Sequence, residues 1–192
     1  MKNFIKNIGL FTLVVLLLSA YNTLDIETKD IDVKNSKVVW KGYKVTGSHE
    51  GTIAIQSGSL EFTDQVLTGG KVIIDMTSID CTDLTDENKG KLEGHLKSDD
   101  FFGVEKYNTA SLVFTEVKPK GKNAYSVIGD LTIKSTTQPV TFEISVYGNK
   151  ATTNLKIDRT QYDVKYGSAS FFDGLKDKAI YDEFDLVADL EF

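Results

Sequence analysis

The chain has 192 residues, which is a usual length for one domain and enough to bury a core without disulfide bonds. Its 28 acidic and 22 basic residues give a net charge of −6 at pH 7, and the acidic residues are spread along the chain, which disfavours nucleic acid and anionic membrane surfaces as partners. The single cysteine, Cys81, cannot form an internal disulfide, so the fold must depend on its apolar core.

The N-terminus has the three-part layout of a secretory signal peptide. Lys2 and Lys6 precede a mostly apolar run over 8–18, and the small residues Ser19 and Ala20 follow it. The run is shorter than the ~20 apolar residues that a membrane-spanning helix needs, so an uncleaved anchor is the weaker alternative. We expect a periplasmic or secreted protein with no stable membrane insertion once the signal is removed.

The chain then divides into a predicted signal peptide over 1–20, an N-terminal extension over 21–29 and one domain over 30–192. From about Asp30, short segments of alternating apolar and polar residues recur between turns rich in Gly, Asn, Asp and Lys. This rhythm predicts an all-β meander. The first candidate strands lie over 37–42, 51–55, 59–63 and 71–76.

The segment over 85–102 breaks the alternation and predicts a short helix. Thr85 is a candidate N-cap, and the two acidic residues after it favour the positive end of a helix dipole. Apolar residues then recur at helical spacing, together with His95, at Leu92 and Leu96. A polar turn over 98–100 follows and presents two aromatic residues, Phe101 and Phe102. We expect this segment to cover one mouth of the fold.

Alternation returns after the helix and is clearest at the C-terminus. Five apolar residues from Phe184 to Phe192 share one face, and acidic residues occupy most of the other. The segment from Val140 to Val146 repeats the pattern. The remaining candidate strands lie over 111–117, 124–133, 151–157 and 162–166.

Strands with one apolar face suit a single antiparallel barrel of about eight strands. Closing the sheet removes the exposed edges that would otherwise invite aggregation. A two-sheet sandwich is the alternative, and alternation alone does not separate the two architectures.

The sequence offers few groups for catalysis or metal binding. His49 and His95 are the two histidines, and neither has a zinc-type spacing to another ligand. Asp80, Asp83 and Asp86 lack the spacing of a calcium loop, and helix capping explains them better. We expect no enzyme activity, no catalytic residues, no metal and no cofactor other than a bound isoprenoid or fatty-chain lipid.

His49 is one candidate for an inward polar side chain. It shares the parity of Ile53 and Ile55, so in a regular strand all three point to the interior. A core histidine bonded to a neighbour is the favoured interpretation, and contact with a ligand is the alternative.

Arg159 is the other candidate and the only arginine in the chain. It continues the parity of Leu155 and Ile157, which places its guanidinium inside the barrel or at its rim. A salt bridge with Asp158 is the favoured interpretation. The alternative is that Arg159 contacts the polar head of a ligand whose chain fills the barrel.

Aromatic residues occur on most predicted strands and on the helical segment. Large inward side chains can either fill an eight-stranded barrel or line a ligand cavity, and composition leaves both open. These residues are Trp40, Phe62, Phe101, Phe102, Phe114, Phe142, Tyr162, Tyr166, Phe171, Phe172 and Phe184.

Six segments, in order along the domain, resemble one known family. They are 40–62 with its GSHEG and GSLEF motifs, 74–79, 91–102 with KLEGHLKSDDFF, 129–133, 158–162 and 174–184. Together they resemble the YceI-like, polyisoprenoid-binding family over nearly the whole predicted domain. Asn108 departs from the proline that is common there, which affects a loop.

The resemblance implies an extended lipocalin-like barrel with a hydrophobic tunnel that binds a polyisoprenoid or related long-chain lipid in the bacterial envelope. It also implies that the segment with His95 covers part of the barrel. A ligand-free barrel that contacts another envelope protein is the alternative. A homodimer is one assembly that we expect for such a protein. The candidate tunnel and rim residues are Trp40, His49, Ile53, Ile55, Phe62, His95, Phe101, Phe102, Phe114, Ile133, Phe142, Ile144, Arg159 and Tyr166.

Overall fold

The structure is a computed structural model that describes residues 25–192, so the predicted signal peptide lies outside the described residues. The described part forms nine strands, one α-helix and two short 3-10 helices. The elements are β1 (Ile26–Asp30), β2 (Lys37–Lys44), β3 (Gly47–Thr63), β4 (Val66–Cys81), α1 (Asp86–Lys97), β5 (Thr109–Pro119), β6 (Ala124–Ile133), β7 (Thr136–Tyr147), β8 (Lys150–Asp158), η1 (Arg159–Tyr162), η2 (Lys176–Lys178) and β9 (Ile180–Glu191). None of the described helices has the length and hydropathy needed to cross a membrane.

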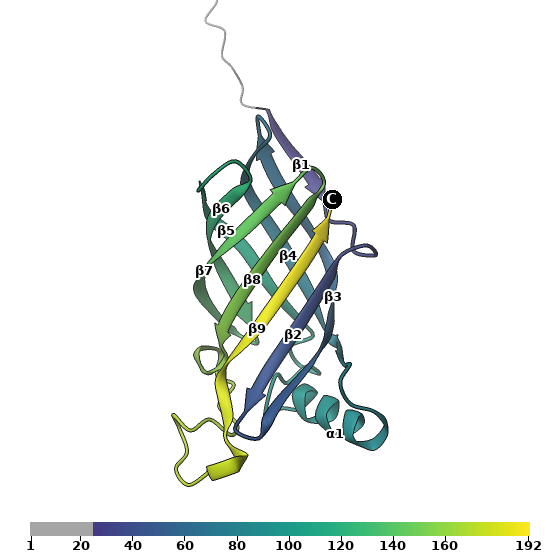
Figure 1. Ribbon diagram of the computed structural model, residues 1–192, viewed down its shortest axis with the longest axis vertical. Helices are drawn as coiled ribbons and strands as arrows, with labels where there is room; N and C mark the ends of the chain where they lie inside the picture. Colours follow the sequence, from purple (N-terminus) through teal and green to yellow (C-terminus); the bar gives the residue numbers. More distant parts are fainter. Residues whose placement is uncertain (1–24) are drawn as a thin grey trace, which may run out of the picture.

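The strands form one antiparallel sheet that closes on itself (Figure 1). Neighbours follow the order β3-β2-β9-β8-β7-β6-β5-β4, and β4 pairs again with β3 to close an eight-stranded barrel. β1 lies outside the ring and pairs with the second half of β3. The closed barrel predicted from the sequence is confirmed, and the sandwich is wrong.

The barrel is elongated and its two ends differ. α1 and the loop over 163–179 lie at one end, which we call the helix end, whereas β1 and the C-terminus lie at the other, which we call the far end (Figure 1). The inward faces predicted for 140–146 and 184–192 are confirmed, because their apolar residues join the buried clusters.

β3 corrects one predicted boundary. The segments predicted as two strands, 51–55 and 59–63, belong to one strand of 17 residues. An irregularity between Ile55 and Ser57 in the pairing with β4 shifts the parity, so Ile55 and Leu60 both face the core. β1 was not predicted, and it places part of the segment interpreted as an extension in the sheet.

The segment over 162–166 was predicted as a strand, and this prediction is wrong. The chain turns there through η1, where the Asp158 side chain accepts a hydrogen bond from the Thr160 backbone N–H at 2.9 Å. The residue that ends η1, Asp163, is left-handed with a φ of 60°. Tyr162 and Val164 are both buried, although neither lies in a strand.

α1 forms where the sequence predicts it, next to the end of β4. Thr85 precedes it as expected, but its side chain makes no capping hydrogen bond. No residue of α1 is fully buried, so its apolar side chains partly cover the barrel end rather than join its core. The turn after α1 is confirmed, with the Phe101 backbone N–H donating to the Ser98 carbonyl at 3.0 Å.

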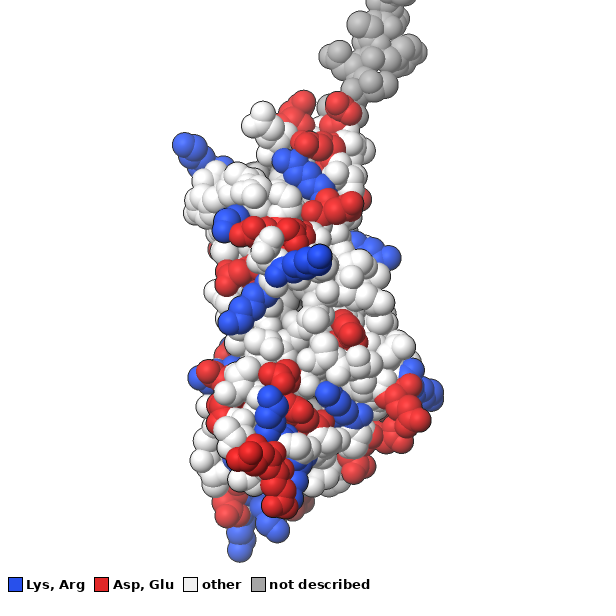
Figure 2. All heavy atoms as spheres, turned by 90° about the vertical axis from the view of Figure 1, so that its right-hand side faces the viewer, with Lys and Arg blue, Asp and Glu red and all other residues white. Residues whose placement is uncertain are grey.

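The surface mixes both signs of charge. On the face of Figure 2, acidic and basic side chains are interspersed at both ends of the barrel, with a less charged zone between them. Several pairs are salt-bridged across neighbouring strands, such as Lys41 with Glu50 at 3.3 Å and Lys156 with Asp185 at 3.0 Å. Exposed pairs of this kind contribute little to stability.

Candidate functional site

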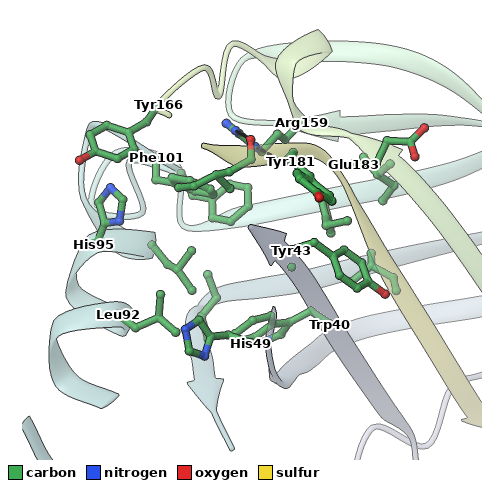
Figure 3. Close-up of a pocket in the computed structure, with 18 of the residues that line it drawn as sticks. Trp40, Tyr43, His49, Leu92, His95, Phe101, Arg159, Tyr166, Tyr181 and Glu183 are labelled. Carbon is green, nitrogen blue, oxygen red and sulfur yellow. Dashed lines mark hydrogen bonds between the residues drawn. The ribbon is translucent and has the colours of Figure 1, made fainter. Parts of the chain in front are cut away.

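A cavity of about 490 Å³ occupies the helix-end half of the barrel. This volume lies within the ~300–1,000 Å³ that is usual for small-molecule sites. Its walls come from the inward faces of β2–β6, β8 and β9, and α1 and the loop over 163–179 add the rim (Figure 3). Tyr166 and Tyr181 line it and are about half exposed, so the cavity reaches the surface at the helix end.

Nine of the fourteen residues predicted for a tunnel line this cavity. They are Trp40, His49, Ile53, His95, Phe101, Phe102, Ile133, Arg159 and Tyr166. The other five are Ile55, Phe62, Phe114, Phe142 and Ile144, and they belong to the packed core of the far half or lie against it. Alternation identifies inward side chains, but it does not say whether the space between them is filled.

Trp40 forms one wall of the cavity. Its Nε1 donates to the Thr52 carbonyl at 3.2 Å, which satisfies its one polar group. Its ring lies over Gly51, the residue that faces it on β3, and a Cβ there would be 2.6 Å from Trp40 Cζ2. The glycine therefore lets the indole lie along the wall instead of across the lumen.

His49 also lines the cavity, and it is hydrogen-bonded to Asp83, which is not part of the lining. Its Nδ1 and Asp83 Oδ2 are hydrogen-bonded at 2.9 Å. Asp83 also accepts hydrogen bonds from the Glu50 backbone N–H and the Cys81 thiol, at 3.2 and 3.0 Å. Burial alone would raise the pKa of Asp83, but these hydrogen bonds outweigh it and lower the pKa. The hydrogen bond expected for His49 is present, but its side chain is 26% exposed and lies in the cavity wall rather than in the packed core.

Cys81 is fully buried at the end of β4. Burial, and then the hydrogen bond to Asp83, raise the pKa of its thiol. Its thiol is therefore a structural donor rather than a reactive group.

The Arg159 side chain holds the loop over 163–179, which we call the rim loop, against the start of β9. Its Nε donates to the Tyr181 carbonyl at 3.0 Å, and its terminal nitrogens donate to the carbonyls of Val164 at 2.6 Å and Ile180 at 3.0 Å. The side chain is only 2% exposed, and burial lowers its pKa. The nearest carboxylate is Asp182, at 3.7 Å.

The salt bridge predicted between Arg159 and Asp158 is therefore not what the structure shows. Asp158 instead caps η1, where its carboxylate accepts from the backbone and hydroxyl of Thr160. Adjacent residues on a strand point to opposite faces, and the turn into η1 does not bring these two side chains together.

Three aromatic rings close part of the mouth. The His95 ring on α1 meets Tyr166 edge to face, with centroids 4.4 Å apart, and meets Phe101 at 5.5 Å. Tyr166 belongs to the loop over 163–179, so this contact joins the two segments that cover the helix end (Figure 3). Within the described chain, His95 Nε2 is buried without a hydrogen-bond partner.

Sequence reasoning missed several lining residues. Met76 and Leu131 lie on inward faces of β4 and β6, where the same alternation could have identified them. Ile79 also lines the cavity, but an irregularity in the pairing of β4 with β3 changes the parity before it, so alternation could not have identified it. Tyr43 carried no such signal, because the pairing of β2 with β9 becomes irregular beside it. Its hydroxyl donates to Asp185 Oδ2 at 2.6 Å, so its polar end is also satisfied.

The arrangement suits an apolar guest. Trp40 Nε1, the Tyr43 hydroxyl, His49 Nδ1 and the Arg159 guanidinium are bonded to protein atoms, so these four residues present mostly carbon atoms to the cavity. Among residues 25–192, no group of three or more His, Cys, Asp or Glu side chains is placed to hold a metal ion.

Comparisons with known proteins agree with the fold. A UPF0312 protein of Vibrio parahaemolyticus is 32% identical over 126 residues, which cover 64% of this chain and 62% of that relative. Burkholderia cenocepacia BcnA matches with a TM-score of 0.66 and 24% identity, over 83% of this chain and 98% of that structure. A polyisoprenoid-binding domain from Saccharophagus degradans matches with a TM-score of 0.56 and 14% identity, over 87% of this chain and 99% of that domain.

The aligned part of the Vibrio protein is less than two thirds of its length, and the two solved structures establish likeness of fold. The YceI-like domain matches residues 30–192, which is nearly all of the described chain. The protein therefore belongs to the YceI-like family.

Proposed function

We propose that this protein binds a long-chain apolar molecule, a polyisoprenoid or related lipid, in the helix-end cavity and sequesters or carries it in the bacterial envelope. The observation that carries the proposal is a cavity walled by apolar side chains that reaches the surface at one end. The fold shared with a polyisoprenoid-binding domain supports it. The envelope location rests on the signal-like layout of residues 1–20.

Binding of this kind needs little polar recognition. Each buried methylene contributes about 0.8 kcal/mol, so a chain of about a dozen gains on the order of 10 kcal/mol. Immobilising the chain offsets part of this gain. We expect dissociation constants in roughly the micromolar range or below.

We propose a binding role rather than catalysis because the candidate polar groups are committed to structural hydrogen bonds. Asp83 accepts the hydrogen bond with His49, and three backbone carbonyls accept those of Arg159. Neither arrangement presents a nucleophile next to a base.

The second candidate is a barrel that works by contacting another envelope protein without a ligand. One observation favours it. Phe171 and Phe172, on the rim loop, are each 51% exposed, and exposed aromatic side chains are common at interaction sites.

Native mass spectrometry of the protein purified from its own envelope tests the proposal. We expect a reproducible mass increment that organic extraction releases as one class of long-chain lipid. An empty protein that also takes up no isoprenoid or fatty alcohol would contradict the carrier and favour the interaction protein. Detergent-treated, refolded protein provides the ligand-free reference.

A further inference from the structure

The interior of the barrel is hollow in one half and filled in the other. In the far half, Leu60 and Val127 are fully buried, and two aromatic pairs lie inside the sheet. Phe62 stacks on Phe192 with centroids 5.5 Å apart, and Phe114 meets Phe142 edge to face at 5.6 Å.

The inward side chains there are tightly packed. A Cβ added at Gly70 would be 2.9 Å from both Leu60 Cδ2 and Phe114 Cε2, closer than carbon atoms normally approach. A Cβ at Gly129 would likewise be 2.9 Å from Leu112 Cδ1. Side chains in such an interior fill space at near-crystalline density.

The floor of the cavity lies where these two halves meet. Val38 belongs to the packed cluster and also lines the cavity. Ala110 lines the cavity and pairs with Ile74 on β4, which in turn pairs with Ile55 of the packed cluster. Ala110 is thus a small residue at the level of the floor.

The strand geometry gives the depth. Along β2 the lining extends from Val38 at the floor to Lys44 at the mouth, which is six residue steps. At ~3.3 Å a step and a tilt of ~40°, the cavity is about 15 Å deep. A fully extended chain advances roughly 1.2 Å for each bond, so about 12 bonds reach from floor to mouth.

We infer that the protein buries one apolar chain of about 12 to 16 main-chain carbons, equivalent to roughly three or four isoprene units. The upper value allows for the loop over 163–179, which extends beyond the strand ends (Figure 1) and adds lining residues such as Tyr166. The remainder of a longer lipid lies outside the mouth, beside polar rim residues such as Lys44, Asp177 and Lys178. This inference rests on the proposed function and specifies the ligand class.

A length series of saturated primary alcohols, from about 8 to about 24 carbons, tests the limit. We expect the dissociation constant to improve by up to roughly fourfold per methylene and then to level off at about 12 to 16 carbons. Continued improvement to the longest alcohol would overturn the inference while leaving the proposed function in place. If the folded protein binds no alcohol of any length, both are wrong.

Filling the floor is a second, independent test. Ala110→Phe places a ring near the floor of the cavity and should move the plateau to shorter chains by about 3 to 5 carbons. Val113→Phe, on the outer face of the same strand and 39% exposed, is the matched control and should leave the plateau unchanged. An equal response of the two variants would contradict the position of the floor. Ala110→Leu provides a smaller change if the phenylalanine variant does not fold.

Discussion

The indole of Trp40 covers Gly51 across the β2–β3 pair, so a Cβ at that glycine would lie 2.6 Å from the ring and 1.9 Å from the Asp80 carbonyl oxygen. A methyl group therefore cannot fit without moving the backbone of β4 and pushing the indole into the cavity. We predict that Gly51→Ala lowers the free energy of unfolding by about 1–3 kcal/mol and weakens lipid binding.

Gly42→Ala is the matched control for the effect on stability, because a Cβ at Gly42 meets nothing within 4 Å. Urea titration of both variants measures the difference in the free energy of unfolding. Equal stability of the two would show that the indole does not depend on the glycine.

Arg159→Lys tests the anchor of the rim loop. Lysine cannot reproduce the planar fork that serves three carbonyls, and buried carbonyl groups would lose their donors. We expect a loss of about 2–4 kcal/mol in stability and faster hydrogen exchange over 163–179, with lipid affinity little changed in the folded protein.

Lys156→Arg is the reverse exchange at an exposed position. It should change neither the stability nor the hydrogen exchange over 163–179. If instead Arg159→Lys abolished lipid binding without loss of stability, Arg159 would contact the lipid head and the anchor interpretation would fail.

The lowered pKa of Asp83 predicts acid sensitivity. A carboxyl whose folded-state pKa lies below its unfolded value contributes stability that is present above the unfolded value, about 3.9, and is lost as the pH falls through the folded value. Asp83→Asn should cost about 1–2 kcal/mol at neutral pH and lose less stability than the parent protein below about pH 4.

Thermal unfolding followed across this pH range provides the measurement. Asp64→Asn, in the turn between β3 and β4, is the control, because asparagine tolerates its left-handed φ of 51°. Parallel pH profiles for Asp83→Asn and the parent protein would rule out the assigned role of this carboxylate.

Tyr166→Ala should weaken the contact between the two covering segments. The His95–Tyr166 pair has edge-to-face geometry, which contributes about 0.5–1.5 kcal/mol, so we expect lipid to dissociate about 2- to 10-fold faster. Stopped-flow transfer of a fluorescent fatty alcohol to vesicles measures this rate. Phe171→Ala, on the same loop but outside the cavity lining, should leave it unchanged.

Much of the barrel could be predicted because alternation is a direct consequence of one face being buried. The inward set of β9, from Phe184 to Leu190, follows from the sequence alone. The continuous β3 did not, because a bulge at 55–57 changes parity in mid-strand and resembles a turn between two strands.

The site was harder to predict for a different physical reason. Phe114 and Ile133 both face inward, yet the first lies in the filled half and the second lines the cavity. Whether space remains depends on which side chains meet across the barrel, and that depends on long-range register. The hydrogen-bond partners of Arg159 were missed for a similar reason, since they are backbone carbonyls of the 163–179 loop and of β9.

The pairing of β2 with β9 joins residues near the two ends of the described chain, with Val38 opposite Ala188. Every other seam of the ring joins strands that are neighbours in sequence. The barrel therefore cannot close until its final strand is available, and a chain lacking β9 would be an open sheet with two unpaired edges. Completion of the last twelve-residue strand is the step that commits this chain to its native topology.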